Sequence, residues 1–338
     1  MTQHAVFRAD ASRQIGGGHV ARCLTLADKL LTMGWSCTLV TNKETKNFFP
    51  ELNQSLHKII FTSLADPLSK YFKSENILVI DHYQLDATFE NSCRKIFKHI
   101  MVIDDLATNL HDCDLLLDQN PGRLHSDYAG LTSKHTQLFI GPHYALLDSN
   151  FASRRSDVLT RRRSPNVPPR ILIMPGLTDP LCIAPRVLSV TSNTCPNSLI
   201  DIVLSSNAAS IPKLKKMVLK TPSKVSLITD RKNIIDILST ADICIGAGGV
   251  SSLERCCLGL PSIIITIAKN QSLTAERLDF YGAAINLGSA DLFFEDKLAV
   301  HLNDLSKNLN KRRSMSENGA QICDGRGVNR MACAINAL

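Results

Sequence analysis

The stretch Gly16-Gly17-Gly18-His19 decides the interpretation of the first half of this chain. It follows the apolar run Ala5-Val6-Phe7 and begins a helical pattern over 20–33. Glycine lets the backbone adopt φ > 0 and approach a ligand closely, and a helix N-terminus favours anions. A histidine there titrates near neutrality, which indicates acid–base chemistry on a phosphorylated substrate. A strand-to-helix turn that merely needs glycine is the simpler alternative.

Length and composition indicate a two-domain globular protein. The chain has 338 residues, of which 44% are hydrophobic, and it contains no apolar run of the roughly 18 residues that span a bilayer. Its N-terminus lacks the pattern of a signal peptide, so we expect a cytoplasmic protein with no membrane partner. Eleven cysteines include no Cys-x-x-Cys pair, which argues against a zinc site.

The net charge of +7 fits either nucleic acid or a small diphosphate substrate. The densest basic cluster, Arg161-Arg162-Arg163, has no aromatic neighbours and falls in a predicted linker or exposed helix. We therefore expect no nucleic-acid partner.

Strand and helix patterns alternate along the chain, which predicts α/β architecture with parallel sheets. The expected strands are 5–8, 36–41, 58–62, 77–81, 100–104, 114–118 and 137–140, then 170–174, 200–204, 224–229, 243–245, 262–267 and 284–287. The expected helices are 20–33, 87–97, 233–240, 251–258, 274–281, parts of 292–316, and 328–337. The predicted domains are 1–155 and 170–322, joined by a linker over 156–169, and the segment 323–338 is a candidate to pack back on the first domain. Ligands of such sheets bind beyond the carboxyl ends of the strands.

A second glycine turn, Gly246-Ala247-Gly248-Gly249, follows an apolar strand and precedes a helix. Gly248 and Gly249 remove side chains, which leaves the following N–H groups available to a diphosphate. Ser251 or Ser252 is placed to cap that helix and donate to a phosphate oxygen. Glu254 is placed to accept hydrogen bonds from a ribose, and simple capping with a favourable dipole contact is the alternative.

Polar residues follow several other predicted strands. Asn270 and Gln271 suit recognition of sugar hydroxyl or acetamido groups, although Asn270 alone also fits helix capping. Tyr83, in Asp81-His82-Tyr83, is placed to bond a sugar or position a water molecule.

The charged residues of the first half leave alternatives open. Arg22 is placed to reach a phosphate or to pair with Asp10, and Asp105 to hold His19 or another group. The adjacent carboxylates Asp104 and Asp105 lack partners at metal-ligand spacing, so we expect no metal. We find no defensible partner for His82 or His111.

Taken together, these motifs resemble the UDP-sugar hydrolases of pseudaminic acid biosynthesis over nearly the whole chain. The residues that carry the resemblance are Arg8-x-Asp10, Ile15-Gly16-x-Gly18-His19-Val20-x-Arg22-Cys23-Leu24, Asp81-His82-Tyr83, Ile103-Asp104-Asp105-Leu106-Ala107, Asp118-Gln119-Asn120, Gly141-Pro142-x-Tyr144, Gly246-Ala247-Gly248-Gly249, Glu254-Arg255-Cys256-Cys257-Leu258-Gly259, Ala268-x-Asn270-Gln271 and Asp324-Gly325-x-Gly327. The chain departs from the family pattern at Pro175, Val250 and Leu253.

The resemblance implies two Rossmann-like domains facing a cleft, as in GT-B glycosyltransferases. It implies hydrolysis of a UDP-linked diacetamido-trideoxy sugar of the altrose type to free sugar and UDP, without metal or other cofactor. On this model His19 is the general base, Tyr83 and Asn270 lie near the sugar, and Gly249, Ser251 and Glu254 bind the nucleotide.

Two alternatives remain open. One is a GT-B glycosyltransferase that moves the sugar to an acceptor, and the other is a nucleotide-sugar-binding homologue with impaired catalysis. The oligomeric state is not predicted.

Overall fold

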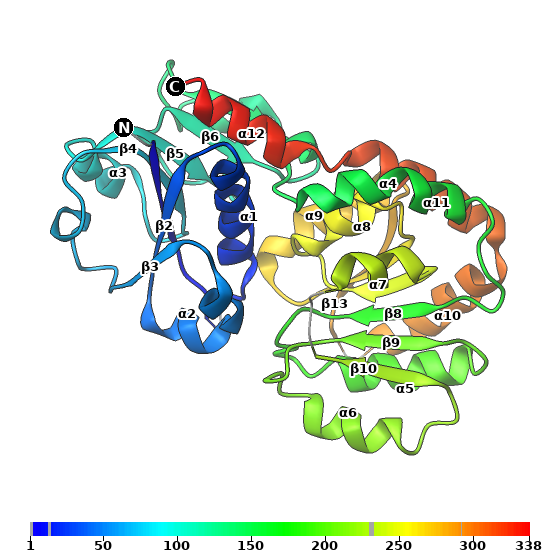
Figure 1. Cartoon of the computed structure of the whole chain (residues 1–338). Helices are drawn as coiled ribbons and strands as arrows, with labels where there is room; N and C mark the ends of the chain where they lie inside the picture. Colours follow the sequence, from blue (N-terminus) through cyan, green and yellow to red (C-terminus); the bar gives the residue numbers. More distant parts are fainter. Residues whose placement is uncertain (1–2, 13–14, 230–232, 292) are drawn as a thin grey trace. The chain divides into compact units, whose positions relative to one another are not determined.

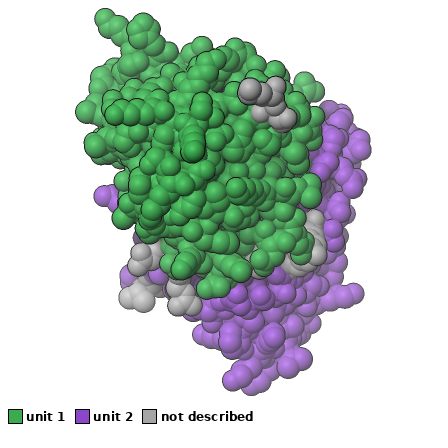
Figure 2. All heavy atoms as spheres, turned by 60° about the vertical axis from the view of Figure 1, so that its left-hand side comes forward, with its two compact units in different colours: residues 1–148, 326–338 green, residues 149–325 purple. Residues whose placement is uncertain are grey.

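The computed structural model describes residues 3–12, 15–229, 233–291 and 293–338. The chain divides into unit 1, Met1–Asp148 with Arg326–Leu338, and unit 2, Ser149–Gly325 (Figure 2). Each unit is a parallel sheet with helices packed on it (Figure 1), which confirms the predicted α/β class. The domain limits expected from the sequence remain predictions. In the part of the chain that the structure describes, each helix is too short or too polar to cross a bilayer.

The sheet of unit 1 has seven parallel strands in the order β3-β2-β1-β4-β5-β6-β7. The strand order reverses between β1 and β4. The helices that follow these two strands, α1 after β1 and α3 after β4, pack on opposite faces of the sheet. The strands are β1 (His4–Ala9), β2 (Ser36–Thr41), β3 (Lys58–Phe61), β4 (Glu75–Asp81), β5 (Phe97–Ile103), β6 (Leu115–Asp118) and β7 (Gln137–Ile140). The α-helices are α1 (Gly18–Thr32), α2 (Lys43–Phe48), α3 (Ala87–Cys93) and α12 (Gly327–Asn336). Four 3₁₀ turns complete the unit: η1 (Pro50–Gln54), η2 (Leu68–Lys70), η3 (His125–Tyr128) and η4 (Pro142–Tyr144).

Strand β4 shows why the sequence forms a central strand. Ile77 and Val79 are buried in the core beneath α1, whereas Leu78 and Ile80 are buried in the core on the other face. Successive side chains of a strand point to opposite faces, so a continuous apolar run is required when both faces are covered. The strand ends at Asp81, which places a carboxylate at the carboxyl edge of the sheet.

The C-terminal helix α12 packs against α1 within unit 1. Its buried residues recur with helical spacing in the same core as α1: Val328, Met331, Ala332 and Ile335. Trp35 donates a 3.0 Å hydrogen bond from Nε1 to Asn336 at the end of the helix. The chain therefore leaves unit 1 after Asp148 and returns to it at Arg326.

The sheet of unit 2 has six parallel strands in the order β10-β9-β8-β11-β12-β13. Helices α5, α6 and α10 cover one face, and α8 contacts both α4 and α11. The strands are β8 (Ile171–Met174), β9 (Ile200–Val203), β10 (Val225–Ile228), β11 (Ile243–Gly246), β12 (Ser262–Thr266) and β13 (Ala284–Ser289). The helices are α4 (Ser149–Arg162), α5 (Ala184–Thr194), α6 (Ile211–Val218), α7 (Ile234–Thr240), α8 (Ser251–Cys257), α9 (Ser272–Phe280), α10 (Phe294–Lys307) and α11 (Leu309–Ile322), with the 3₁₀ turn η5 (Lys269–Gln271).

Several element predictions were incomplete or wrong. The expected helix over 87–97 ends at Cys93, because Phe97 is buried and begins β5 beside Glu75 of β4. Helices α2, α5 and α6 were not predicted. The segment of α5 is rich in Ser, Thr and Val, which form helices poorly in isolation, and packing of Val187 and Leu188 on the sheet stabilises it.

The basic triplet lies at the end of α4, where two of its arginines bond inside unit 2. Arg162 is buried and donates to the carbonyl oxygens of Leu258 at 2.6 Å and Ala241 at 2.7 Å. Arg161 donates to Ala241 as well, at 2.8 Å. Burial lowers the pKa of Arg162 to about 9. These two guanidinium groups thus satisfy carbonyls at the ends of α7 and α8. Of the triplet, only Arg163 is exposed.

Candidate functional site

The first glycine turn connects β1 to α1 at the point where the strand order of unit 1 reverses. Gly16 has φ +80, a conformation that favours glycine, and its N–H donates to Ser12 at 2.8 Å. Gly17 occupies the N-cap position, and its carbonyl accepts the N–H of Ala21 at 3.0 Å. Helix α1 begins at Gly18, so His19 lies in the first helical turn.

His19 is fixed by a buried carboxylate. Its Nδ1 lies 2.5 Å from Oδ1 of Asp81, whose side chain is fully buried at the end of β4. Burial alone would raise the pKa of Asp81, but Arg22 and His19 hold it well below its usual range. An anionic Asp81 accepts the Nδ1 proton, which leaves Nε2 as the ring acceptor. Nε2 has no hydrogen-bond partner among the described residues.

Arg22 lies one turn after His19 and joins two carboxylates. Its Nε and Nη2 donate to Asp81 at 2.5 and 2.6 Å. Its Nη1 and Nη2 donate to Asp105, each at 2.8 Å. The expected pairing of Arg22 with Asp10 is therefore wrong, whereas Asp105 holds another group, Arg22, as one of the alternatives expected. Because Arg22 is 2% exposed and four of its five N–H groups are used, we no longer assign it to a phosphate.

Tyr83 contacts both His19 and Asp105. Its ring packs edge-on against His19 with centroids 4.7 Å apart, and its hydroxyl donates to Asp105 at 3.2 Å. The structure thus brings together four predicted site residues: His19, Arg22, Tyr83 and Asp105. Asp81 was not among the predicted site residues, although its position at a strand end directly before His82 and Tyr83 was a usable signal.

Asp10 belongs to a separate polar group at the end of β1. It pairs with Arg8 at 2.5 Å and with His82 Nε2 at 3.3 Å, and it accepts the N–H of Asn42 at 2.8 Å. Burial opposes its charge, but His82 and Arg8 hold the pKa of Asp10 well below its usual range. His82 therefore has a partner that the sequence did not reveal, and Asp10 ties β1 to the residue after β2.

A second buried histidine lies further along the same edge. His111 Nδ1 is 2.7 Å from Glu90 Oε1, and Nε2 is 3.8 Å from Asp104 Oδ2. Burial disfavours the imidazolium, but the negative charges of Asp104 and Glu90 and the hydrogen bond to Glu90 outweigh it and raise the pKa of His111 to about 9. The sequence analysis found no partner for His111, because the pattern of residues does not show which acids the fold brings to it.

The second glycine turn lies in unit 2 between β11 and α8, after the fourth strand of the unit, whereas the first glycine turn follows the first strand of unit 1. The order of strands reverses here between β8 and β11. A side chain at Gly246 would approach the Met174 carbonyl to 2.8 Å, and one at Gly248 would approach the Gln271 carbonyl to 3.1 Å. Gly249 accepts the N–H of Ser252 at 2.8 Å. Close approach of neighbouring backbone therefore explains the first two glycines.

The capping prediction for this turn was wrong. Val250 occupies the N-cap position of α8, and no side chain caps the helix. Ser251 accepts a hydrogen bond from Arg255 at 3.2 Å, and Ser252 accepts one from the same guanidinium at 3.1 Å. Arg255 also donates to the Ala247 carbonyl at 2.7 Å, so it stabilises the turn from inside.

The remaining predicted residues of unit 2 have different surroundings. Gln271 uses its side-chain oxygen to accept the N–H groups of Gly248 at 3.3 Å and Ile267 at 3.2 Å, so it holds the turn in place. Asn270 is exposed on η5, and Glu254 is partly buried in the first turn of α8. Of these residues, the structure places Gly248, Gly249 and Gln271 together.

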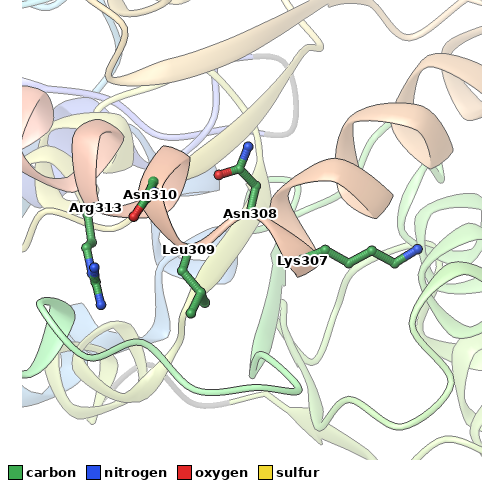
Figure 3. A pocket seen from close by; sticks show the side chains of 5 residues that line it. All are labelled: Lys307, Asn308, Leu309, Asn310 and Arg313. Atoms are coloured by element: carbon green, nitrogen blue, oxygen red, sulfur yellow. The ribbon is translucent and has the colours of Figure 1, made fainter.

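A surface hollow of about 510 Å³ lies elsewhere in unit 2, at the junction of α10 and α11 (Figure 3). The charged ends of Lys307 and Arg313 point in different directions there and do not converge on one point. None of the predicted site residues lines this hollow; its lining residues are Lys307, Asn308, Leu309, Asn310 and Arg313.

Comparisons with known proteins agree with this architecture. No family model matches the chain. The chain is 23% identical over 349 residues to the spore coat polysaccharide biosynthesis protein SpsG of Bacillus subtilis, covering 99% of this chain and 98% of that protein. It is 26% identical over 273 residues to the UDP-2,4-diacetamido-2,4,6-trideoxy-beta-L-altropyranose hydrolase of Campylobacter jejuni, covering 80% of this chain and 94% of that protein. The solved structure of MurG from Acinetobacter baumannii matches with a TM-score of 0.67 at 14% identity, over 99% of this chain and 100% of that one. The predicted GT-B-like fold is thereby confirmed.

Proposed function

We propose that this protein hydrolyses a UDP-linked diacetamido-trideoxy sugar of the altrose type to free sugar and UDP, in pseudaminic acid biosynthesis. The name of the Campylobacter relative describes this activity, and the name of the Bacillus relative refers to polysaccharide biosynthesis. The single observation that carries the proposal is the geometry of His19, whose Nδ1 bonds to buried Asp81 while Nε2 faces no protein partner in the described residues.

In this proposal His19 acts as general base. Nε2 accepts a proton from water, and the water oxygen attacks the anomeric carbon. The bond between that carbon and the UDP oxygen breaks, and its electron pair leaves with UDP. A positioned base of this kind contributes about 10²–10⁴-fold to the rate. Tyr83 and Asn270 are proposed to contact the sugar.

Unit 2 is proposed to bind the UDP group. The N–H groups near Gly248 and Gly249 and the hydroxyl of Ser251 would donate to the diphosphate, and Glu254 would accept from the ribose hydroxyls. Gly17 and Gly18 are proposed to line the sugar side near His19. Asp10 and Gln271 support neighbouring protein groups in the structure, so we assign them no direct contact with substrate.

Product analysis tests this proposal. The protein is incubated with UDP-linked diacetamido-trideoxy sugars without an acceptor, and products are followed by NMR, with and without EDTA. We expect free sugar and UDP in equal amounts, insensitive to EDTA. Release only when an acceptor is added would identify a glycosyltransferase of the same fold. Tight UDP binding without turnover of any of these sugars would identify a binding homologue.

A further inference from the structure

Asp105 is joined to His19 through a continuous set of side chains in unit 1. Its carboxylate accepts two hydrogen bonds from Arg22, and Arg22 donates two more to Asp81. Asp81 in turn bonds to His19 Nδ1 at 2.5 Å. The Arg22 guanidinium and the Asp81 side chain are almost fully buried, at 1% and 0% exposure, so water screens their charges weakly.

The charges of this set are not balanced while His19 is neutral. Two carboxylates and one guanidinium leave one net negative charge beside the imidazole. When Nε2 accepts a proton, the four side chains together become neutral. If Asp105 were uncharged, the set would instead gain a net positive charge at that step, which a buried site disfavours.

We propose that Asp105 is a positioning residue that makes His19 a stronger base, by fixing Arg22 and supplying the negative charge that proton transfer neutralises. This inference rests on the proposed role of His19 as general base. Arg22 has the opposite effect on the charge of the site, since its positive charge opposes a second positive charge on the imidazole.

Other ionisable groups lie near this set. Arg8, Asp10 and His82 pair with one another at the end of β1. The Cys23 thiol lies 3.9 Å from Asp81, and burial together with that carboxylate raises its pKa, so it stays neutral. Arg123 donates to the backbone carbonyl of Asp105 at 2.9 Å and pairs with Asp118. Burial and the nearby charge of Asp105 raise the pKa of Asp118 to about 6. The Tyr83 hydroxyl donates a hydrogen bond to Asp105 at 3.2 Å.

The central test substitutes Asp105→Asn and measures the pH dependence of kcat. The acid limb of the profile is expected to move to lower pH by about half a unit to one unit, because the imidazolium loses a favourable charge. The plateau of kcat is expected to fall as the base weakens, while KM stays within about twofold. Asp105→Glu restores the charge and is expected to return the limb toward its original position.

Arg22→Gln should move the acid limb of the kcat profile in the opposite direction. Removing the guanidinium leaves two carboxylates to stabilise the imidazolium, so the acid limb is expected to move to higher pH. Asp112→Asn is the matched control, because it removes a carboxylate of unit 1 that pairs with Arg94. Its profile is expected to remain in place. If Arg22→Gln does not fold, the Asp105→Asn and Asp105→Glu pair still decides the proposal.

The same shift is measurable without substrate. NMR titration of the His19 ring protons, assigned by their loss in His19→Asn, is expected to move in the same directions as the acid limbs. A titration that is identical in wild type and Asp105→Asn would overturn the inference. A shifted titration in a protein that turns over no UDP-sugar would instead retain the charge coupling and reject the proposed function.

Discussion

The two glycine turns both lie beside the point where the strand order of their sheet reverses. They follow different strands, the first strand of unit 1 and the fourth strand of unit 2, and are built from different chemistry. The turn before α1 leads into a helix of 15 residues whose first turns carry His19 and Arg22, both bonded to carboxylates. The turn before α8 leads into a helix of seven residues, where Arg255 bonds to a carbonyl and to hydroxyl groups. Ion pairs organise the first turn, whereas hydrogen bonds between side chains and uncharged backbone or hydroxyl groups organise the second.

This difference indicates a division of roles. A titratable group held by buried charges is suited to proton transfer, because its orientation and protonation are set by the protein. A turn whose glycines allow neighbouring backbone to approach closely is suited to presenting N–H groups to an anion. We propose that unit 1 supplies the acid–base chemistry and unit 2 the binding. Two of the four substitutions below, His19→Asn and Glu254→Ala, test that division, and the other two test the scaffold around the turns.

The largest effect is expected from His19→Asn. If His19 is the base, kcat should fall by about 10²–10⁴-fold while the affinity for UDP stays unchanged. Steady-state kinetics and calorimetry with UDP measure the two quantities. His135→Asn, an exposed histidine of the same unit, serves as the control and should leave both unchanged. Wild-type turnover in His19→Asn would remove the residue from the mechanism.

Glu254→Ala, in contrast to His19→Asn, should weaken the binding of UDP. Loss of hydrogen bonds between a carboxylate and the ribose is expected to weaken UDP binding by about 10–100-fold. Calorimetric titration measures this loss directly. Glu276→Ala removes an exposed carboxylate of α9 in the same unit and should bind UDP as wild type does. Equal affinity in both variants would contradict the ribose contact.

Arg162→Met tests the scaffold beneath the binding turn. The substitution removes the Arg162 donors from the carbonyls of Leu258 and Leu238, so the free energy of unfolding should fall by about 2–4 kcal/mol. Arg163→Met is the matched control from the same triplet, since Arg163 is exposed, and it should change stability little. Chemical denaturation of both variants measures the difference. Similar stability in the two would show that the buried bonds contribute nothing.

The smallest effect is expected from His111, which lies outside the glycine turn that carries His19. Glu90 and Asp104 raise its folded pKa to about 9 from an ordinary 6.5, so its charge stabilises the fold fully below about pH 6.5. That contribution is lost as the pH rises through about 9. In His111→Gln, the fall in melting temperature between these pH values should be smaller than in wild type. The exposed control His125→Gln should reproduce the wild-type fall.

Much of the fold was predictable from local patterns. The apolar run of β4 and the helical spacing of α12 are visible in the printed sequence, because burial on a sheet face requires them. Helix α5 was not predictable in this way, since packing overrides the weak helix propensity of its residues. Likewise, the early end of α3 depends on Phe97 joining a strand whose partner lies outside the segment.

The candidate site likewise has features that the local sequence predicts and features that depend on tertiary contacts. His19 and the two glycine turns stand out because glycine and histidine have uncommon conformational and acid–base properties. The contacts around His19 do not stand out, because Asp81 lies 62 residues from it and Asp105 lies 83 residues from Arg22. Among several acids at strand ends, only the three-dimensional register decides which one meets a given base.

The amino-acid sequence by itself determined the α/β class, the strand positions and the turn that carries the histidine, because burial and glycine geometry are local constraints. Tertiary structure alone decided that Arg22 binds two carboxylates, that Arg162 is buried, and that Asp81 orients His19. Those outcomes depend on which strand ends lie side by side, and parallel pairing brings together residues that are distant along the chain.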